Sequence, residues 1–597
     1  MSLMFQSSAL GCVVLMALGL PMLISPPAQA ELTVAQGSGS FLGQGTQVQF
    51  NGQTYSAPWA RWQDSAGRPA IGMSDSSLMQ QLGVDLLNSN DYRQQPLRWF
   101  TEQPTVAATR FHPSGTLRYL DISPLAQQQG WQVQPVGNVL QISAPAARTQ
   151  AVRVGRQPWG NRVVVELDQP APWQTTRLTN SRDGNTLREF TLTVNAAALP
   201  GAVQNTNLAA GNALRTLKVN RAANQTVIEG TFAGNVRPHI WMLPNPNRLV
   251  IDLRPDLAGS RDIAWAPGLR WREQMIGVGG RQYPVTWLAV DPRQARLQPI
   301  WGNPNALVGL QPLTTIATQS QAAAAINGGY FTRDRQTPLG AIRRNGQWIS
   351  SPILNRGVIA WNQQGQFRVG RLALRETLTT ASGQTLSVAS SDSGYPQRGI
   401  ARYTRLWGST YTPILQNEQI ITVESDRVTR QQRAASTAIP IPSNGYLLVL
   451  RDVEAPALTA GTQVQHQASP TPGDFSGFSE ILGGGPLLIE NGRVVLNAEA
   501  ESFRPPFGTQ VAPRSGIAQL GDGTILLAAS HNRVGGAGPT LREWAEILRS
   551  MGAVQALNLD GGSSTTLFLG GQLIDRHPVT AARVQNGIGV FITPPNP

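Results

Sequence analysis

The clearest pattern of apolar and polar positions lies near the carboxyl end of the chain, at residues 540–559. Apolar residues recur there at the spacing of one helical face, and Thr540 and Glu543 have the spacing of a capping box. Gly552 is placed to end the predicted helix. The apolar residues 554–559 then predict a strand that opens into a loop at Asp560. The helical face consists of Leu541, Trp544, Leu548 and Met551.

Alternating patterns predict strands in the first half of the chain, and two of these strands echo each other. Residues 161–168 and 247–254 both begin with Asn-Arg and continue with alternating apolar positions. The sequence Pro244-Asn245-Pro246 predicts the turn before the second strand. A further strand is predicted at 139–143.

Helices are predicted near 75–87, 123–129 and 314–325. In the second of these, Ser123 is the expected N-cap, Pro124 the first helical residue and Gly130 the C-terminal stop. Many short strands with few helices predict a multidomain, β-rich chain that ends in an α+β domain.

Asp560 begins a loop with unusual chemistry, Asp560-Gly561-Gly562-Ser563-Ser564. Glycines after an acid allow backbone conformations in which successive N–H groups point at an anion, with the hydroxyls of Ser563 and Ser564 beside them. Such a loop suits a phosphate or a sugar. The alternative is a tight turn in which Asp560 bonds only to its own backbone.

Further glycine motifs precede and follow this loop in a fixed order. Together with it they resemble the phosphodiester glycosidase family over residues 272–597, and the order is more specific than any single motif. The motifs are residues 324–331 (AAINGGYF), 481–489 (ILGGGPLLI), 512–518 (APRSGIA), 558–564 (NLDGGSS) and 584–591 (VQNGIGVF).

The resemblance implies hydrolysis of a sugar joined through its anomeric carbon to a phosphodiester, as in N-acetylglucosamine-1-phosphodiesters. A carboxylate would stabilise positive charge at the anomeric carbon. Asp560 is the first candidate for this role and Glu480 the second catalytic carboxylate, with their division of labour open. Arg514 would hold the phosphate, because a guanidinium matches two phosphate oxygens.

The remaining candidates would bind substrate. Asn327 and Asn586 would position sugar hydroxyl or acetamido groups, and Arg398 and Arg533 are additional phosphate contacts. Each residue also has a structural alternative: Asn327 could belong to a hairpin turn, Arg514 and Arg398 could be surface arginines, and Glu480 could be a solvated loop acid.

One position departs from the family pattern. His531-Asn532-Arg533 stands where relatives carry an acidic residue, a glycine and an arginine, so His531 replaces the acid. A histidine with a pKa of about 6.5 could act as a general acid or base, or be an ordinary loop residue. A non-catalytic glycan-binding or exopolysaccharide-assembly protein is therefore the alternative to an enzyme.

The length of 597 residues suggests about three domains after an export signal. Residues 1–30 have the pattern of a signal peptide, with an apolar run and an Ala28-Gln29-Ala30 cleavage site. No Lys or Arg precedes the run, so an uncleaved anchor is the alternative. We expect export to the periplasm, the cell envelope or the exterior. The only cysteine, Cys12, lies in this segment, so no disulfide is expected in the mature chain.

Residues 31–148 resemble a small α+β stalk-like domain, and residues 149–260 resemble the AMIN domain, an envelope β-sandwich. The second resemblance implies peptidoglycan as a partner; a generic β-sandwich is the alternative. The net charge of +13 comes almost entirely from arginine and favours anionic partners such as phosphorylated glycans, although genome composition would also explain it.

No nucleic-acid motif is present, and no second apolar run reaches the roughly 18 residues that a membrane span needs. No cofactor is expected, because the five histidines are scattered and lack zinc-ligand spacing. A calcium or magnesium ion held by Asp560 and backbone oxygens stays open.

Overall fold

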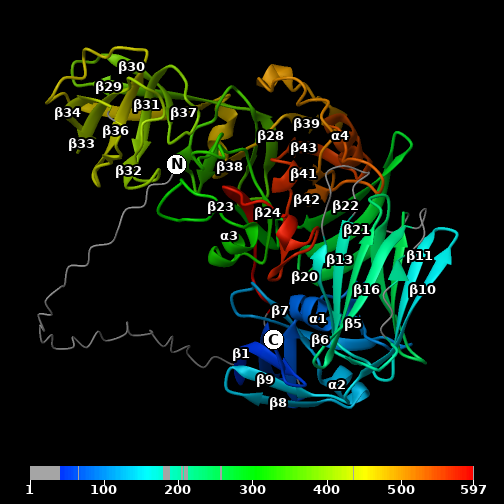
Figure 1. The fold of residues 1–597 in the computed structure, drawn as a ribbon. Coiled ribbons are helices and arrows are strands. Elements are labelled where there is room, and N and C mark those ends of the chain that lie inside the picture. The colour runs from blue at the N-terminus through cyan, green and yellow to red at the C-terminus, as the bar shows by residue number, and fades with distance from the viewer. Residues whose placement is uncertain are drawn as a thin grey trace, which may run out of the picture. The chain divides into compact units, whose positions relative to one another are not determined.

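The computed structural model describes residues 41–64, 66–178, 188–202, 206–207, 213–255, 259–434 and 436–595. The predicted signal segment 1–30 lies outside the described residues. Strands predominate over helices in the described ranges and form several separate sheets (Figure 1), which confirms the prediction of a β-rich chain with several structural parts. No helix within these ranges is long and apolar enough to cross a membrane.

Residues 43–143 form a nine-stranded sheet with two helices. Helix α1 (Asp75–Leu82) ends at Gly83 in the left-handed conformation, so it is shorter than predicted, and the chain continues into β4. Helix α2 (Ser123–Gln129) ends at Gly130 as predicted, but its N-cap is Ile122 rather than Ser123. The strands are β1 (Gly43–Phe50), β2 (Gln53–Gln63), β3 (Pro69–Ser74), β4 (Asp85–Leu86), β5 (Gln94–Arg98), β6 (Thr105–Phe111), β7 (Arg118–Asp121), β8 (Gln132–Val136) and β9 (Val139–Ser143).

Residues 148–254 form two five-stranded sheets. The two echoed segments are strands β11 and β19, and they pair directly in antiparallel register, with Asn161 opposite Leu253. One sheet contains β10 (Arg148–Gln157), β11 (Gly160–Leu167), β14 (Ala197–Ala198), β18 (Arg237–Leu243) and β19 (Arg248–Arg254). The other contains β12 (Trp173–Leu178), β13 (Arg188–Val194), β15 (Thr206–Asn207), β16 (Leu214–Ala222) and β17 (Gln225–Phe232).

An eight-stranded sheet lies at the centre of the carboxyl-terminal half, and helix α4 (Leu541–Ser550) packs on it. The predicted capping box between Thr540 and Glu543 is present, and the buried apolar face of α4 covers β39 and β43. The strand order is β20 (Arg261–Ala266), β21 (Leu269–Val278), β22 (Arg281–Val290), β42 (Ile525–Ser530), β41 (Arg514–Leu520), β43 (Ala553–Asn558), β39 (Leu487–Glu490) and β40 (Arg493–Val494).

A five-stranded sheet beside it has the order β23 (Ala295–Trp301), β46 (Asn586–Ile592), β24 (Ala324–Asn327), β44 (Leu567–Leu569) and β45 (Gln572–Leu573). Helix α3 (Leu313–Gln319) is shorter than the predicted helix at 314–325. Gln321 has a positive φ of 58°, and the alanines after it enter strand β24 between β44 and β46. Burial between two strands overrides the helix propensity of alanine here.

A third sheet has the order β26 (Gln347–Ser350), β25 (Ile342–Arg344), β38 (Glu480–Gly483), β27 (Gly357–Trp361) and β28 (Phe367–Arg371). Between β28 and β38 the chain forms a further sheet with its own apolar clusters, in yellow-green in Figure 1. Its order is β34 (Arg427–Arg433), β33 (Gln419–Glu424), β36 (Gly445–Arg451), β31 (Gly399–Thr404), β30 (Thr385–Ser391), β29 (Ala373–Thr380) and β37 (Val464–Thr471), with β32 (Thr410–Tyr411) and β35 (Ile439–Pro440) as a separate pair.

A buried ion pair within the amino-terminal part forms hydrogen bonds to β20 of the eight-stranded sheet. Arg118 Nε lies 3.2 Å from Asp75 Oδ2, with both side chains almost fully buried. Asp75 Oδ2 also accepts a hydrogen bond of 2.6 Å from the indole of Trp265 in β20. Strand β20 already belongs to the eight-stranded sheet, so this sheet begins at Arg261. It therefore starts before residue 272, where the predicted resemblance to the glycosidase family begins.

Candidate active site

The glycine motifs meet where several strands of the carboxyl-terminal half end. Asn327 ends β24, Arg514 begins β41, and Asn558 ends β43. The N–H of Asp560 donates to the carbonyl of Gly328 at 3.0 Å, and the N–H of Gly485 donates to the carbonyl of Asn558 at 2.8 Å. The structure therefore brings the loops of Asn327, Arg514 and Asp560 together.

The glycines are required because the loops pack backbone against backbone. A Cβ on Gly328 would lie 2.0 Å from Asn586 Oδ1, and one on Gly329 would lie 2.3 Å from the carbonyl oxygen of Gly483. A Cβ on Gly561 would lie 2.7 Å from the carbonyl oxygen of Pro513. Close approach of neighbouring loops thus explains these glycines, rather than backbone flexibility alone.

The expectation of a nest of free N–H groups after Asp560 is wrong for most of the loop. The N–H of Gly562 donates to Pro513, that of Ser564 to Gly561, and that of Thr565 to Gly562. Residues 562–564 form a short 3₁₀ helix, which uses these donors internally. An anion at this site must therefore be held mainly by side chains.

Asp560 presents a half-buried carboxyl group on a fixed backbone. Its N–H bonds to Gly328, and its carbonyl accepts a hydrogen bond of 2.6 Å from the Nδ2 of Asn327. Burial raises the pKa of Asp560 to about 6, although the Ser564 side chain and the positive charge of Arg333 oppose the shift. The carboxyl group can therefore exchange a proton close to neutral pH.

Both predicted sugar-binding amides hold the loops together. Asn327 is fully buried, and its Oδ1 accepts from the Ser515 hydroxyl at 2.7 Å and from the Thr566 N–H at 3.1 Å. Asn586 Oδ1 accepts from the Gly329 N–H at 2.8 Å. These contacts assign a positioning role to both residues, and direct contact with a sugar stays a prediction.

Arg514 is a buried cation without a carboxylate partner among the described residues. Its Nε donates to the carbonyl of Pro539 at 3.1 Å, its Nη2 donates to the carbonyl of Gln510, and its side chain forms none of the ion pairs seen in the described ranges. Only 4% of the residue is exposed, and this burial lowers the pKa of Arg514. A buried guanidinium balanced only by neutral groups favours an anionic ligand.

Arg356 is a second cation that the sequence did not reveal. Its guanidinium lies 4.0 Å from the ring centroid of Phe503 and 5.9 Å from that of Tyr330. The carboxylate of Glu501 forms no ion pair with it, because that group accepts the backbone N–H groups of Gly357 and Leu487, although its negative charge raises the pKa of Arg356. No motif surrounds Arg356 in the sequence, so only the fold identifies it.

Tyr330 connects the two arginines with the loops. Its hydroxyl donates to the carbonyl of Gly485 at 2.7 Å and accepts from the Nδ2 of Asn558 at 2.9 Å. Burial raises the pKa of Tyr330, and the charge of Asp560 adds to the shift, whereas Arg514 and Arg356 oppose it. The aromatic residue after Asn-Gly-Gly was the available sequence signal for this position.

Two more arginines belong to the loop after Asp560. Arg333 donates from Nη2 to the Ser563 hydroxyl at 3.1 Å and lies near enough to Asp560 to lower its pKa. Arg576 donates from Nη1 to the carbonyls of Thr565 at 2.9 Å and Ser563 at 3.3 Å. Arg576 thus fixes the shape of the loop, and Arg333 stays at its exposed edge.

His531 is anchored by an acid from another part of the chain. Its Nε2 lies 2.8 Å from Oδ2 of Asp575, whose carboxylate is fully buried and whose Oδ1 accepts the N–H of Leu567 at 2.8 Å. Asp575 therefore places a buried carboxylate directly beside His531. Arg533 packs against Gly536 in the turn after β42, where it shows no contact with Asp560 or Arg514.

Glu480 and Arg398 do not join this cluster. Glu480 begins β38, opposite Trp361 of β27, and its Oε1 accepts the backbone N–H of Asn345 at 2.9 Å. The charges that influence it are those of Arg344 and Arg296, not those around Asp560. Arg398 lies in the sheet between β28 and β38, where its Nε donates to the carbonyl of Asp452. Glu480 lies at the start of β38, whereas Gly483 at its other end lies near the Asp560 loop. Strand β38 thus separates Glu480 from Asp560, the two carboxyl groups that the sequence predicts as catalytic partners.

The comparisons with known proteins identify a family for part of the chain. Residues 417–591 match the family model described as Phosphodiester glycosidase. A mouse N-acetylglucosamine-1-phosphodiester alpha-N-acetylglucosaminidase is 32% identical over 106 residues, which are 16% of this chain and 20% of the mouse protein. The chain thus matches about a fifth of the length of that curated relative.

Two solved structures extend the comparison. The crystal structure of a hypothetical protein from Synechocystis is 43% identical, with a TM-score of 0.85, over 92% of this chain and 99% of that one. The catalytic domain of the zebrafish N-acetylglucosamine-1-phosphodiester alpha-N-acetylglucosaminidase is 16% identical, with a TM-score of 0.29, over 55% of this chain and 84% of that one. The first likeness shows that the whole described architecture is shared.

The chain therefore carries a phosphodiester glycosidase family domain over residues 417–591. This confirms the family predicted from the glycine motifs. The matched range includes Arg514, Asp560 and Asn586, whereas Asn327, Tyr330 and Arg356 lie before it.

Proposed function

We propose that the protein is an exported hydrolase that cleaves the bond between the anomeric carbon of a sugar and a phosphodiester. The observation that carries the proposal is that two neighbouring loops hold Asp560, a half-buried acid with a pKa of about 6, and Arg514, a buried cation with no ion-pair partner among the described residues; the N–H of Gly562 joins these loops by donating to the carbonyl of Pro513. The carbohydrate part would face the acid, and the phosphate would face the cation. Asn327, Tyr330 and Arg576 fix the loops that hold both groups.

In the proposed reaction, water attacks the anomeric carbon and the bond from that carbon to the phosphodiester oxygen breaks. The electron pair leaves with the phosphate and the attacking water releases one proton to the solvent, so the products are the free sugar, a phosphomonoester and a proton. Ionised Asp560 would stabilise the positive charge at the anomeric carbon, as nucleophile or as electrostatic partner. Arg514, assisted by Arg356, would stabilise the departing phosphate.

The distance of Glu480 from this cluster removes it from the proposed chemistry. A phosphate leaving group is a weak base, so its departure needs little protonation. One carboxyl group near the anomeric carbon, together with two cations near the phosphate, is therefore a sufficient set. His531 with Asp575 lies beside the same loop and is available for proton transfer at its edge.

The wider setting is also part of the proposal. We assign an α+β organisation to residues 261–595, an AMIN-like role to residues 149–260 and an envelope or extracellular glycan as substrate. The two five-stranded sheets at 148–254 and the arginine-rich composition support this assignment.

The test is the release of free N-acetylglucosamine from UDP-N-acetylglucosamine and from the methyl phosphodiester of N-acetylglucosamine-1-phosphate. We expect turnover by the mature protein and its loss in Asp560→Asn and in Arg514→Ala. Arg398→Ala is the matched control, because this arginine bonds only to a backbone carbonyl in a different sheet. A wild-type protein that is inert on both substrates, yet sediments with purified cell wall, would instead be a glycan-binding protein.

A further inference from the structure

A cavity of about 400 Å³ lies next to Glu480, at the opposite end of the strands from Asp560. Strand β46 runs from Asn586 at the candidate active site to Ile592 at this cavity, and β23 runs beside it from Trp301 to Ala295. Six residues of extended strand separate the two ends by about 20 Å. The cavity is therefore distinct from the candidate active site, and its volume is in the range of small-molecule sites, roughly 300–1,000 Å³.

Glu480 is the unusual member of the cavity wall. It is only 3% exposed, its Oε1 accepts the N–H of Asn345, and its Oε2 forms no hydrogen bond in the described ranges, although the hydroxyl of Ser479 lies near enough to lower the pKa of Glu480. No arginine of the described ranges approaches it closely enough for an ion pair, although Arg344 and Arg296 lie near enough to influence its pKa. A buried carboxyl oxygen in this state favours a ligand that donates a hydrogen bond.

The rest of the wall combines flat apolar surfaces with amides. Trp361 is 4% exposed, and its indole N–H is already bonded to the carbonyl of Leu297, so the indole contributes carbon surface. The ring of Phe591 lies on another side, with the guanidinium of Arg296 at 4.7 Å from its centroid. The amide side chains of the wall are those of Gln294, Gln298, Asn362, Gln363 and Gln366.

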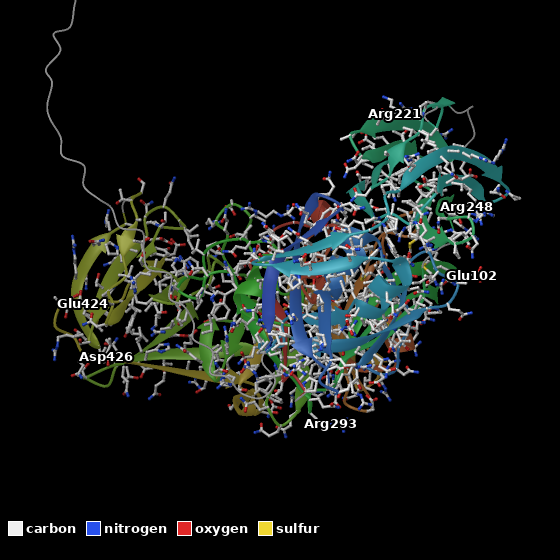
Figure 2. The ribbon with its side chains drawn as sticks, turned by 90° about the horizontal axis from the view of Figure 1, so that it is seen from below. Glu102, Arg221, Arg248, Arg293, Glu424 and Asp426 are labelled. Carbon is white, nitrogen blue, oxygen red and sulfur yellow. The ribbon has the colours of Figure 1, made fainter. Side chains whose placement is uncertain are left out.

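This composition excludes a simple ion as the natural ligand. Arg296 and Arg293 at the cavity oppose a cation, and Glu480 opposes an anion. Arg293 marks the outer rim, because it lies at the edge of the molecule (Figure 2) and is already paired with Asp291 at 2.9 Å. A neutral ligand with apolar ring faces and several hydroxyl groups matches aromatic rings, amides and an unsatisfied carboxyl oxygen together.

We propose that this cavity is a second, non-catalytic carbohydrate site, in which Glu480 accepts hydrogen bonds from the hydroxyl groups of a neutral sugar. The site would hold a glycan unit that carries no phosphate. It does not depend on the proposed hydrolysis, because none of its wall residues contacts Asp560 or Arg514. In a long glycan it would increase affinity without changing the chemical step.

The test measures sugar binding without turnover, using the full mature chain with Asp560→Asn. Chitobiose and cellobiose, which lack phosphate, are the probes, and calorimetry and saturation-transfer NMR are the readouts. We expect binding of at least one probe, and an affinity about tenfold weaker after Glu480→Gln, because the amide satisfies the same hydroxyl groups less well. Glu490→Gln, an exposed acid at the end of β39, is the matched control and should bind as the parent does.

A second variant keeps the test decisive if Glu480→Gln disturbs folding. Arg296→Ala changes an exposed side chain at the cavity, removes its contact with Phe591 and is expected to alter the affinity for the same probe. The proposal is overturned if neither disaccharide binds, or if binding is the same in Glu480→Gln, Arg296→Ala and the parent. Since the probes carry no phosphodiester, loss of the proposed hydrolysis would leave these outcomes unaffected.

Discussion

Asp560 and Glu480 are two acids beside glycine motifs, and burial raises the pKa of both, yet they lie in different surroundings. Asp560 follows the end of a strand, on a loop beside cations that no described carboxylate pairs with. Glu480 begins a strand, where an aromatic and amide wall surrounds it. Closeness to a glycine motif in the sequence therefore does not decide which acid belongs to the candidate active site. What decides it is whether the acid lies at the end of its strand that faces the site.

The largest test of this contrast is the removal of each charge in turn. Asp560→Asn should lower kcat by about a thousandfold, because the positive charge at the anomeric carbon loses its carboxylate. Glu480→Gln should leave kcat on the small methyl phosphodiester within about twofold, because Glu480 bonds to the N–H of Asn345 and lies at the end of β38 that faces away from the Asp560 loop. Steady-state kinetics on both variants makes the measurement. Equal losses in the two variants would unite the two acids in one site and contradict the structure.

The cationic side of the same site gives the next largest effect. Arg514→Ala should lower kcat/KM by about a hundredfold, since a charge-assisted contact to the leaving phosphate is lost. Arg356→Ala should cost less, because its guanidinium is half-exposed and also packs on Phe503. Arg398→Ala serves as the reference for an arginine outside the site, and thermal unfolding of each variant separates misfolding from lost binding. If Arg398→Ala lost as much activity as Arg514→Ala, the phosphate would have to bind elsewhere.

The pH dependence should follow Asp560. Because its pKa is about 6 and the reaction needs the ionised form, the rate should rise about tenfold between pH 5 and pH 7. The effect of pH on folding stability is opposite to its effect on the rate. Folded Asp560 holds its proton more tightly than the unfolded side chain, so its contribution is fully present below a pH of about 4 and is lost as the pH rises through 6. Melting temperatures of the parent and of Asp560→Asn should therefore diverge across this interval in favour of the variant. Parallel curves would show that Asp560 titrates normally.

The smallest effect concerns Arg333, whose charge lowers the pKa of Asp560 from the exposed edge of the loop. Arg333→Ala should move the acidic limb of the pH–rate profile upward by less than about one pH unit, because solvent screens an exposed charge. Arg335→Ala, two residues away and paired with Asp334, is the control. A downward shift in Arg333→Ala would rule out the proposed electrostatic role.

Much of the local structure was predictable because its causes are local. The capping box of Thr540 and Glu543 bonds residues three positions apart, so the start of α4 follows from sequence spacing. Both echoed segments are strands, and burial alternates along β11 as predicted, whereas the middle of β19 is buried continuously. The second half of the helix predicted at 314–325 is wrong, because residues 324–327 pair with a neighbouring strand. The helix propensity of alanine is weak compared with this strand pairing.

The candidate site was predictable only in part. The glycine motifs identified Asn327, Arg514 and Asp560 as candidate site residues, since closely packed loops leave a sequence signature of paired glycines. Tyr330 stood in a motif but without an assigned role. Arg356 and Arg576 carried no signal, because a side chain that reaches a loop from a distant segment needs no particular neighbours in sequence.

The sequence by itself determined the family of the carboxyl-terminal domain, the capped helix, the alternating strands and the acid on the Asp560 loop. Only the tertiary structure decided which charged groups face one another: it separated Glu480 from Asp560, brought Asp575 to His531 and placed Arg356 beside Tyr330. The physical reason is the distance along the chain over which each interaction acts. Caps, turns and alternation act over a few residues, whereas strand order and register bring together residues that are far apart in the chain.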